Sequence, residues 1–297
     1  MPLGKPRLPT LPALPHPHRT SFTGWHRACP GLCWAALSAR LVALAAMALA
    51  AVALATCPAT AQAGLPEVVA QAKPAVVALG LYNELASPRF TFRGTGFVVG
   101  DGRTVVTNAH VVPEETAALQ QLTLQMPGNR KAGSEAAPET RRVTLLRQDR
   151  THDLALLSFD GPPLPTLSLA DDDSGREGQA LAFIGFPIGG LLGFSPVTHR
   201  ATLSSITPIA LPPPHARQLD AAAVARLRQG SFDIYQLDGT AYPGNSGGPL
   251  LDIDTGRVLG VVNMVLVKNS KESVLSSPSG ISYAIPVRFV RALLETR

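Results

Sequence analysis

Short apolar runs rich in β-branched residues follow one another along most of the chain, and turn signals separate them. Runs of this kind predict β-strands, and the turns Asp101-Gly102 and Asp254-Thr255-Gly256 predict hairpins between neighbouring runs. The runs do not alternate with long helical segments, which argues against a parallel Rossmann-type sheet. The sequence therefore predicts an all-β fold. The runs span residues 75–81, 96–99, 103–106, 143–146, 154–159, 180–186, 249–253 and 257–267.

A proline-rich connector over residues 161–178 divides these runs into two halves of ordinary domain size. We expect paired β-barrels, one over residues 64–165 and one over residues 166–297. A short helix is predicted at residues 65–72. A terminal helix that packs on the sheet is predicted at residues 286–296, where apolar residues recur at helical spacing.

Two long stretches, residues 114–142 and 208–231, are polar or proline-rich and predict surface loops. The second includes a possible helix at residues 219–227. Both are long for plain connectors, so they either gate the site and select substrates or are insertions without a role. The Asp171-Asp172-Asp173 run lacks the alternating spacing of a calcium-binding loop and predicts a solvated turn.

Residues 1–63 have the features of an export leader. Arg40 precedes an uncharged run of mostly Ala and Leu over residues 41–55, and the small-x-small segment Ala61-Gln62-Ala63 follows. This order predicts a secretory signal peptide. Two alternatives remain open. One is an uncleaved membrane helix, although the apolar core is shorter than the roughly 20 residues that span a bilayer, and the other is a lipid anchor on Cys57.

Charge and cysteine content narrow the function classes. Five of the 26 basic residues precede Gly64, whereas the first of the 21 acidic residues is Glu67, so the remainder of the chain is neutral. A basic surface is therefore not predicted, and we expect no nucleic-acid partner. All three cysteines lie before Gly64, so a chain cut at that point has neither disulfides nor thiol chemistry.

The most specific segment of the sequence is Pro243-Gly244-Asn245-Ser246-Gly247-Gly248-Pro249. Glycines beside a serine allow a sharp turn that presents Oγ and leaves backbone N–H groups free for a substrate oxyanion. Such a segment fits the nucleophile elbow of α/β hydrolases and also the serine loop of double-barrel proteases. The hydrolases need a histidine after the serine, and none follows here, whereas the proteases use the order His, Asp, Ser.

Four histidines follow the leader, and one of them is a good candidate for a general base. His110 ends a strand signal, where a strand end can direct an imidazole into a cleft. His199 and His215 lie in polar or proline-rich surroundings. His152 adjoins Asp153 and points away from it in an extended chain. Asp153 opens an apolar run, where a buried carboxylate can orient the imidazole of the base, although a turn or capping role is the alternative for an isolated aspartate.

Six segments resemble, in order, the trypsin-like protease domain of the HtrA/Deg family, over roughly residues 65–297. The resemblance implies a chymotrypsin-type double β-barrel of two six-stranded antiparallel barrels with a C-terminal helix. It also places the site between the barrels and implies export to the periplasm. The segments are Gly94-Thr95-Gly96-Phe97-Val98-Val99, Thr107-Asn108-Ala109-His110-Val111-Val112, Asp153-Leu154-Ala155-Leu156-Leu157, Gly185-Phe186-Pro187, Pro243 to Leu250, and Gly280-Ile281-Ser282-Tyr283-Ala284-Ile285-Pro286.

The resemblance assigns roles to individual residues. His110, Asp153 and Ser246 match the catalytic triad, and the backbone N–H groups of Gly244 and Ser246 match the oxyanion hole. Asn263 matches a position that supports the aspartate and lines the substrate cleft.

Three further expectations come from the same resemblance. Thr240, six residues before the serine, matches the base of the primary pocket. Because it offers no carboxylate to a Lys or Arg side chain, we expect cleavage after small or medium apolar residues. Asn245 stands where digestive enzymes have an Asp that pairs with a new N-terminus, so its amide is expected to hydrogen-bond within the loop, and activation should need no free N-terminus. The PDZ domains of many family members are expected to be absent.

The sequence thus predicts a serine endopeptidase that acts by acyl transfer on exported or misfolded envelope polypeptides, with no metal or organic cofactor. The expected location is periplasmic or secreted, with membrane association only through an uncleaved leader. Two alternatives stay open. One is a catalytically silent trypsin-fold protein that binds extended peptides by strand addition, and the other is an esterase that uses the same triad.

Overall fold

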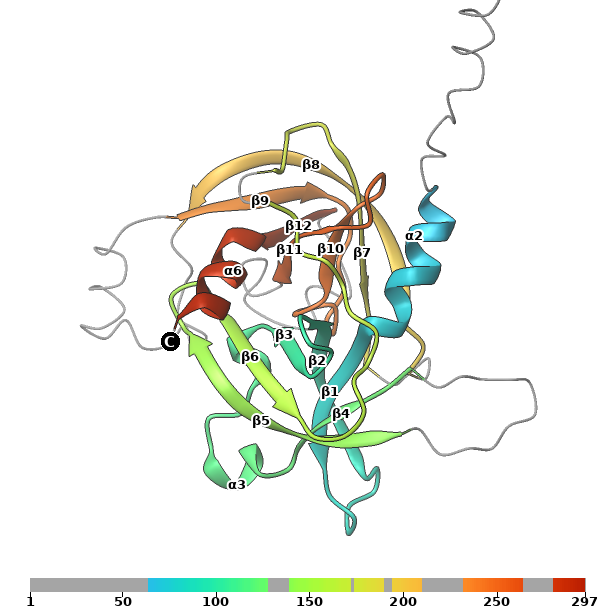
Figure 1. The fold of residues 1–297 in the computed structure, drawn as a ribbon, viewed down its shortest axis with the longest axis vertical. Coiled ribbons are helices and arrows are strands. Elements are labelled where there is room, and N and C mark those ends of the chain that lie inside the picture. The colour runs from blue at the N-terminus through green and yellow to red at the C-terminus, as the bar shows by residue number, and fades with distance from the viewer. Residues whose placement is uncertain are drawn as a thin grey trace, which may run out of the picture. The chain divides into compact units, whose positions relative to one another are not determined.

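The computed structural model describes residues 64–127, 139–171, 174–189, 194–209, 232–263 and 280–296. The chain divides into two units, Met1–Ala61 and Gln62–Arg297, and every described residue lies in the second unit. The described strands of this unit form two closed antiparallel barrels of six strands each (Figure 1). The predicted all-β double barrel is therefore confirmed, whereas the predicted leader lies outside the described residues.

The first barrel has the strand order β1-β2-β3-β6-β5-β4. Apolar side chains on the inner faces of its strands, such as Val77, Val98 and Leu157, fill the interior. Their sequence neighbours Val76 and Leu156 face outward and belong to a buried cluster that continues into the second barrel. Because both faces of these strands are buried, consecutive residues in their sequences, such as Val76 and Val77, are apolar. The strands are β1 (Val76–Tyr82), β2 (Phe90–Val99), β3 (Thr104–Thr107), β4 (Leu122–Gln125), β5 (Thr140–Asp149) and β6 (Leu154–Phe159).

The second barrel repeats this arrangement in the order β10-β11-β12-β9-β8-β7. Phe183, Leu203, Leu237 and Leu250 are fully buried in its core. The connector between the barrels is held to both of them: Leu167 N–H donates to Val98 O over 2.9 Å, and Leu169 forms a bridge with Val258. The strands are β7 (Ala180–Gly185), β8 (Val197–Ile209), β9 (Phe232–Asp238), β10 (Pro249–Asp252), β11 (Val258–Asn263) and β12 (Ile281–Pro286).

Two helices flank the barrels. The helix α2 (Leu65–Ala72) buries Val68, and a 3-10 turn, η1 (Lys73–Ala75), leads from it into β1. The terminal helix α6 (Val287–Glu295) packs against β6 and β11, which come from different barrels. Arg147 on β5 donates from Nη1 to Leu293 O (3.3 Å) and Leu294 O (3.1 Å), and so it satisfies two carbonyls of the last helical turn.

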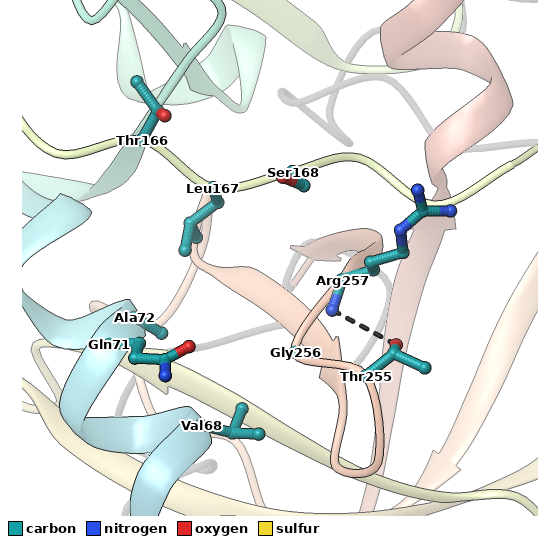
Figure 2. Close-up of a pocket in the computed structure, with 9 residues that line it drawn as sticks. All are labelled: Val68, Gln71, Ala72, Thr166, Leu167, Ser168, Thr255, Gly256 and Arg257. Atoms are coloured by element: carbon teal, nitrogen blue, oxygen red, sulfur yellow. Dashed lines mark hydrogen bonds between the residues drawn. The ribbon is translucent and has the colours of Figure 1, made fainter. Parts of the chain in front are cut away.

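A cavity of about 210 Å³ lies between α2, the connector and the turn that joins β10 to β11 (Figure 2). Its wall is partly polar, and the N–H of Arg257 donates to Thr255 Oγ1 within it over 3.3 Å. None of the candidate catalytic residues lines this cavity, so it is separate from the candidate active site. The lining residues are Val68, Gln71, Ala72, Thr166, Leu167, Ser168, Thr255, Gly256 and Arg257.

The prediction of a surface loop over residues 114–142 was wrong for the parts of it that form a short helix, the strand β4 and the start of β5. A short helix, α3 (Thr116–Leu119), is followed by β4, which pairs with β1 and buries Leu122 and Leu124 completely. The polar Thr123 and Gln125 of β4 are buried as well, so the strand carries no continuous apolar signal in the sequence. Residues 128–138 lie outside the described residues.

The predicted loop at residues 208–231 begins inside a strand, since Pro208 pairs with Asp233 of β9. The rest of that stretch, with the possible helix at residues 219–227, lies outside the described residues. Among the residues that the structure describes, no helix is both long and apolar enough to cross a membrane.

Candidate active site

His110 lies in η2 (Ala109–Val111), a 3-10 turn that follows β3 after one residue. Its ring Nδ1 lies 2.6 Å from Asp153 Oδ2, and its backbone N–H donates to Asp153 Oδ1 over 2.9 Å. When the Nδ1 proton of a neutral imidazole points at this carboxylate, the other ring nitrogen, Nε2, can accept a proton. The 3-10 turn places His110 slightly beyond the strand end at which the sequence put it.

Asp153 directly precedes β6 and has a left-handed backbone conformation with a φ of 52°. This conformation costs an L-residue about 1–2 kcal/mol, so it persists where neighbouring contacts hold it. The carbonyl oxygen of Asp153 accepts hydrogen bonds from Ala109 N (3.1 Å) and Asn108 Nδ2 (3.0 Å). The backbone of Asp153 is thus attached to the same turn that its side chain orients.

Asn263 ends β11 in the second barrel and is completely buried. Its Nδ2 donates to Asp153 Oδ2 over 2.8 Å, the same oxygen that lies against the ring of His110. One carboxylate oxygen therefore contacts donors from both barrels. The exposed fractions of the His110 and Asp153 side chains are 23% and 13%, so the pair is accessible mainly from the imidazole side.

Two residues that the sequence did not single out hold the turn around His110. Arg93 on β2 donates from Nε to Val111 O (2.6 Å) and from Nη2 to His110 O (3.4 Å), and Gln148 Nε2 on β5 donates to Ala109 O (3.3 Å). Partial burial lowers the pKa of the Arg93 guanidinium from its ordinary value. Neither residue belongs to a motif, and no signal in the sequence marks either one.

The serine loop is attached to both barrels. The carbonyl oxygen of Ser246 accepts a hydrogen bond from Thr95 N on β2, and Gly247 N–H donates to Val262 O on β11, each over 2.9 Å. Gly247 has a φ of 86°, and a Cβ at this position would contact Thr95 O and Thr107 Oγ1. A side chain is therefore excluded where the loop meets the first barrel.

Two backbone N–H groups of this loop have no acceptor among the described residues. Asn245 N–H and Gly247 N–H donate to main-chain carbonyls, whereas within the described part of the chain Gly244 N–H and Ser246 N–H donate to none. Gly244 has a φ of 106°, and its carbonyl accepts a 2.6 Å hydrogen bond from Thr95 Oγ1, which holds the peptide between Gly244 and Asn245. Two N–H groups that lack acceptors in this part of the chain, one on each side of Asn245, have the chemistry that an oxyanion hole requires.

Ser246 packs close to the turn that carries His110. Gly94 lies between them, because a Cβ built on Gly94 would be 2.6 Å from Val111 Cγ2 and 3.1 Å from Ser246 O. Among the described residues, no hydrogen bond joins the Ser246 hydroxyl to His110. Nucleophile–base contacts are often long in unliganded enzymes and shorten when substrate binds.

Asn245 is completely buried, and its side chain faces β8. Its Nδ2 lies 3.5 Å from His199 Nε2, and its Oδ1 has no partner among the described residues, so the predicted hydrogen bond within the loop is not formed by this amide. The ring of His199 stacks on Phe183 at 4.8 Å and 16°. His199 thus has polar sequence neighbours but a ring packed on an aromatic side chain, and burial lowers the pKa of His199 from its ordinary value of 6.5.

Thr240, the candidate base of the primary pocket, follows β9 and is partly buried. The backbone on both sides of it is fixed by Ser282, whose Oγ accepts from Ala241 N (2.8 Å) and donates to Gly239 O (2.6 Å). The position of Thr240 at the base of a pocket stays a prediction.

The other histidines lie away from this arrangement or outside the described residues. His152 does not pair with Asp153; its Nδ1 lies 2.6 Å from Asp149 Oδ2, and its ring stacks on Phe289 of α6 at 4.0 Å. Burial acts to raise the pKa of Asp149, but hydrogen bonds and the charge of His152 outweigh it, so the pKa is lowered. His215 is not among the described residues.

The aspartate run of the connector gives no sign of a cation site. Asp171 pairs with Arg257 over 3.2 Å, and the two aspartates after it are not described. In the part of the chain that the structure covers, no group of three or more His, Cys, Asp or Glu side chains is placed to hold a metal ion.

Comparison with protein families places these residues in a known domain. The model of a trypsin-like peptidase domain matches residues 94–261, a range that contains His110, Asp153 and Ser246. A probable periplasmic serine endoprotease, DegP-like, from Halomonas elongata is 30% identical over 198 residues, which cover 65% of this chain and 32% of that protein. Serine protease HTRA1A from Danio rerio is 29% identical over 234 residues, which cover 77% of this chain and 40% of that protein. The chain thus spans less than half the length of these curated relatives.

Solved structures show the same fold. The active form of the Rv3671c protease from M. tuberculosis aligns with a TM-score of 0.55 and 24% identity, over 76% of this chain and 82% of that one. The HtrA-type protease AlgW with a tripeptide aligns with a TM-score of 0.53 and 22% identity, over 78% of this chain and 62% of that one.

Proposed function

The chain belongs to the family of trypsin-like peptidase domains, and from this premise we propose that it is a serine endopeptidase. In this proposal Ser246, His110 and Asp153 form a triad that cleaves peptide bonds through an acyl-enzyme. The observation that carries the proposal is the 2.6 Å contact between His110 and Asp153, beside a serine loop with two N–H donors left unpaired in the described part of the chain.

The arrangement of donors and acceptors supports each chemical step. Ser246 Oγ attacks the carbonyl carbon of the scissile bond while its proton passes to His110 Nε2, and Asp153, held by Asn263, stabilises the imidazolium. The N–H groups of Gly244 and Ser246 bind the oxyanion, and loss of one such donor typically costs about 100-fold or more in rate. His110 then returns the proton to the leaving amine. Water deprotonated by His110 hydrolyses the resulting ester and frees the serine, so the cycle is complete without a metal or organic cofactor.

The proposed substrates are exported or misfolded polypeptides of the cell envelope. The leader predicted at residues 1–63 and the similarity to a relative named as periplasmic support this location. With Thr240 at the base of the primary pocket, cleavage occurs after small or medium apolar residues, because a Lys or Arg side chain loses hydration there without gaining a carboxylate. Asn245 has no charge with which to bind a new terminal ammonium, so residues ahead of Gly64 leave the activity unchanged.

An unfolded protein substrate, such as casein, tests this proposal with the purified chain and four variants. Ser246→Ala, His110→Ala and Asp153→Asn each lose nearly all activity, and combining them adds little further loss because the triad acts as a unit. Ser204→Ala, which changes an exposed serine of β8, is the matched control and retains activity.

Wild-type turnover by Ser246→Ala would refute the assignment. Binding of casein without cleavage by the wild-type chain would favour the catalytically silent alternative. Hydrolysis of small esters without cleavage of peptides would favour the esterase.

A further inference from the structure

Arg93 lies on β2, directly before Gly94 and two residues before Thr95, which binds the serine loop. The residue as a whole is exposed, although its guanidinium is partly buried against the turn of His110. Its guanidinium lies against the turn of the proposed catalytic base, where Nε donates to Val111 O and Nη2 to His110 O. These contacts fix the cation at the edge of the site on the side of the first barrel.

The charge of Arg93 is not neutralised within the described residues, where it forms no ion pair with a carboxylate. Two carboxylates on the neighbouring elements are engaged elsewhere: Asp153 contacts His110 and Asn263, and Glu114 pairs with Arg150 at 2.9 Å. A guanidinium has five N–H donors, and only two atoms of this one, Nε and Nη2, have acceptors among the described residues. Donors thus remain for an incoming anion.

The position of Arg93 relates it to one half of a bound peptide. In the proposed mechanism His110 must reach the departing amine, so the leaving half of the substrate crosses the site on the His110 side, over the first barrel. The acyl half lies over the second barrel, where Thr240 and the oxyanion loop are. Arg93 contacts the backbone of His110 itself, so residues just after the scissile bond pass beside its guanidinium.

We propose that Arg93 is a specificity-determining residue that binds a carboxylate side chain, Asp or Glu, at one of the first three substrate positions after the scissile bond. The inference rests on the proposed endopeptidase function and adds a substrate class to it. Arginine suits this role because its planar donors match the two oxygens of a carboxylate. The interaction is exposed, so its effect is moderate and falls as salt screens the charges.

Internally quenched peptides test this inference. A cleavage site is first identified by mass spectrometry of digested casein, and each of the three positions after it is then occupied in turn by Asp, Asn or Lys. For the wild-type chain we expect kcat/KM at one position to be about two- to five-fold higher with Asp than with Asn, the range that exposed ion pairs contribute. The value with Lys is expected to be lower still, and 0.5 M NaCl should reduce the difference.

Variants separate recognition from a purely structural role. Arg93→Glu is expected to reverse the Asp/Lys ratio and Arg93→Lys to preserve its direction, although both remove hydrogen bonds to the turn of His110. A merely structural role lowers the activity on all peptides and leaves the ratio unchanged. Arg176→Glu, at an exposed arginine of the connector, makes the same charge change and is expected to leave the ratio unchanged.

Two outcomes distinguish the failure of this inference from that of the function. Equal kcat/KM for Asp and Lys peptides, or a ratio that Arg93→Glu does not change, overturns the role of Arg93 and leaves the endopeptidase assignment intact. No cleavage of any peptide by the wild-type chain overturns the proposed function, and the inference with it.

Discussion

Replacement of Gly247 by alanine is expected to destabilise the protein strongly, because the serine loop there lies directly against β2 and β3. The added Cβ would contact Thr95 O and Thr107 Oγ1, of which the first is backbone. The positive φ of 86° costs an L-residue about 1–2 kcal/mol, and forcing extra atoms into a packed site typically costs about 1–3 kcal/mol. We therefore expect Gly247→Ala to lower the free energy of unfolding by about 2–5 kcal/mol.

Gly100→Ala provides a matched control. Gly100 also has a positive φ, of 63°, but a Cβ there meets nothing within 4 Å. This variant therefore has a similar backbone cost without the steric cost, and the loss of unfolded-chain entropy on replacing glycine is common to both. The difference between the two variants, about 1–3 kcal/mol, reports the close approach alone.

Urea and thermal unfolding of both variants measure this difference, in a Ser246→Ala background that prevents self-cleavage. A domain of this size shifts its Tm by about 2–4 °C for each kcal/mol. Equal destabilisation by Gly247→Ala and Gly100→Ala would refute the claim that the serine loop is closely packed on the first barrel.

Three further predictions concern residues around the site and between the barrels. Asn263→Ala removes a hydrogen-bond donor to Asp153, and hydrogen bonds to charged groups contribute about 1.5–3 kcal/mol. Steady-state assays should therefore show kcat lower by roughly 10- to 100-fold with KM little changed. An unchanged kcat contradicts this role. His199→Leu tests the lowered pKa of His199. The contribution of this residue to the free energy of unfolding is fully present above pH 6.5 and is lost as the pH decreases towards the folded-state pKa, because the unfolded state takes up the proton first. Unfolding measured at several pH values should show a weaker dependence for the variant in that window, and identical slopes would refute the prediction. Asp149→Asn tests the lowered pKa of a carboxylate, whose stabilising contribution is present above pH 3.8 and is lost as the pH falls further. The variant should therefore lose less stability between pH 4 and pH 2 than the wild-type chain does.

The sequence predicts the fold well where strands are buried on both faces. The run at residues 154–159 coincides with β6, because every position but Ser158 is buried and apolar or small. The prediction fails where polar side chains are buried or a strand has one open face. β4 buries Thr123 and Gln125, and β8 alternates buried and exposed residues, so neither gives an apolar run.

The candidate site could be outlined from the sequence because the chemistry needs particular residue types and each protease fold places them in its own order along the chain. His110 and Asp153 are 43 positions apart, and the structure brings them into contact. The supporting contacts could not be found in this way. The contacts of Arg93 and His199 depend on strand register, and the sequence around each residue resembles ordinary strand or loop.

Labelling by a serine-reactive phosphonate tests the central claim most directly. The wild-type chain and Ser246→Ala are incubated with the reagent, and the modified peptide is identified by mass spectrometry. We expect a single adduct on Ser246 in the wild-type chain, no adduct in Ser246→Ala, and strongly reduced labelling in His110→Ala, because the hydroxyl reacts only when the imidazole takes its proton. Equal labelling of the wild-type chain and Ser246→Ala, or an adduct on another residue, would contradict the assignment of Ser246 as the nucleophile.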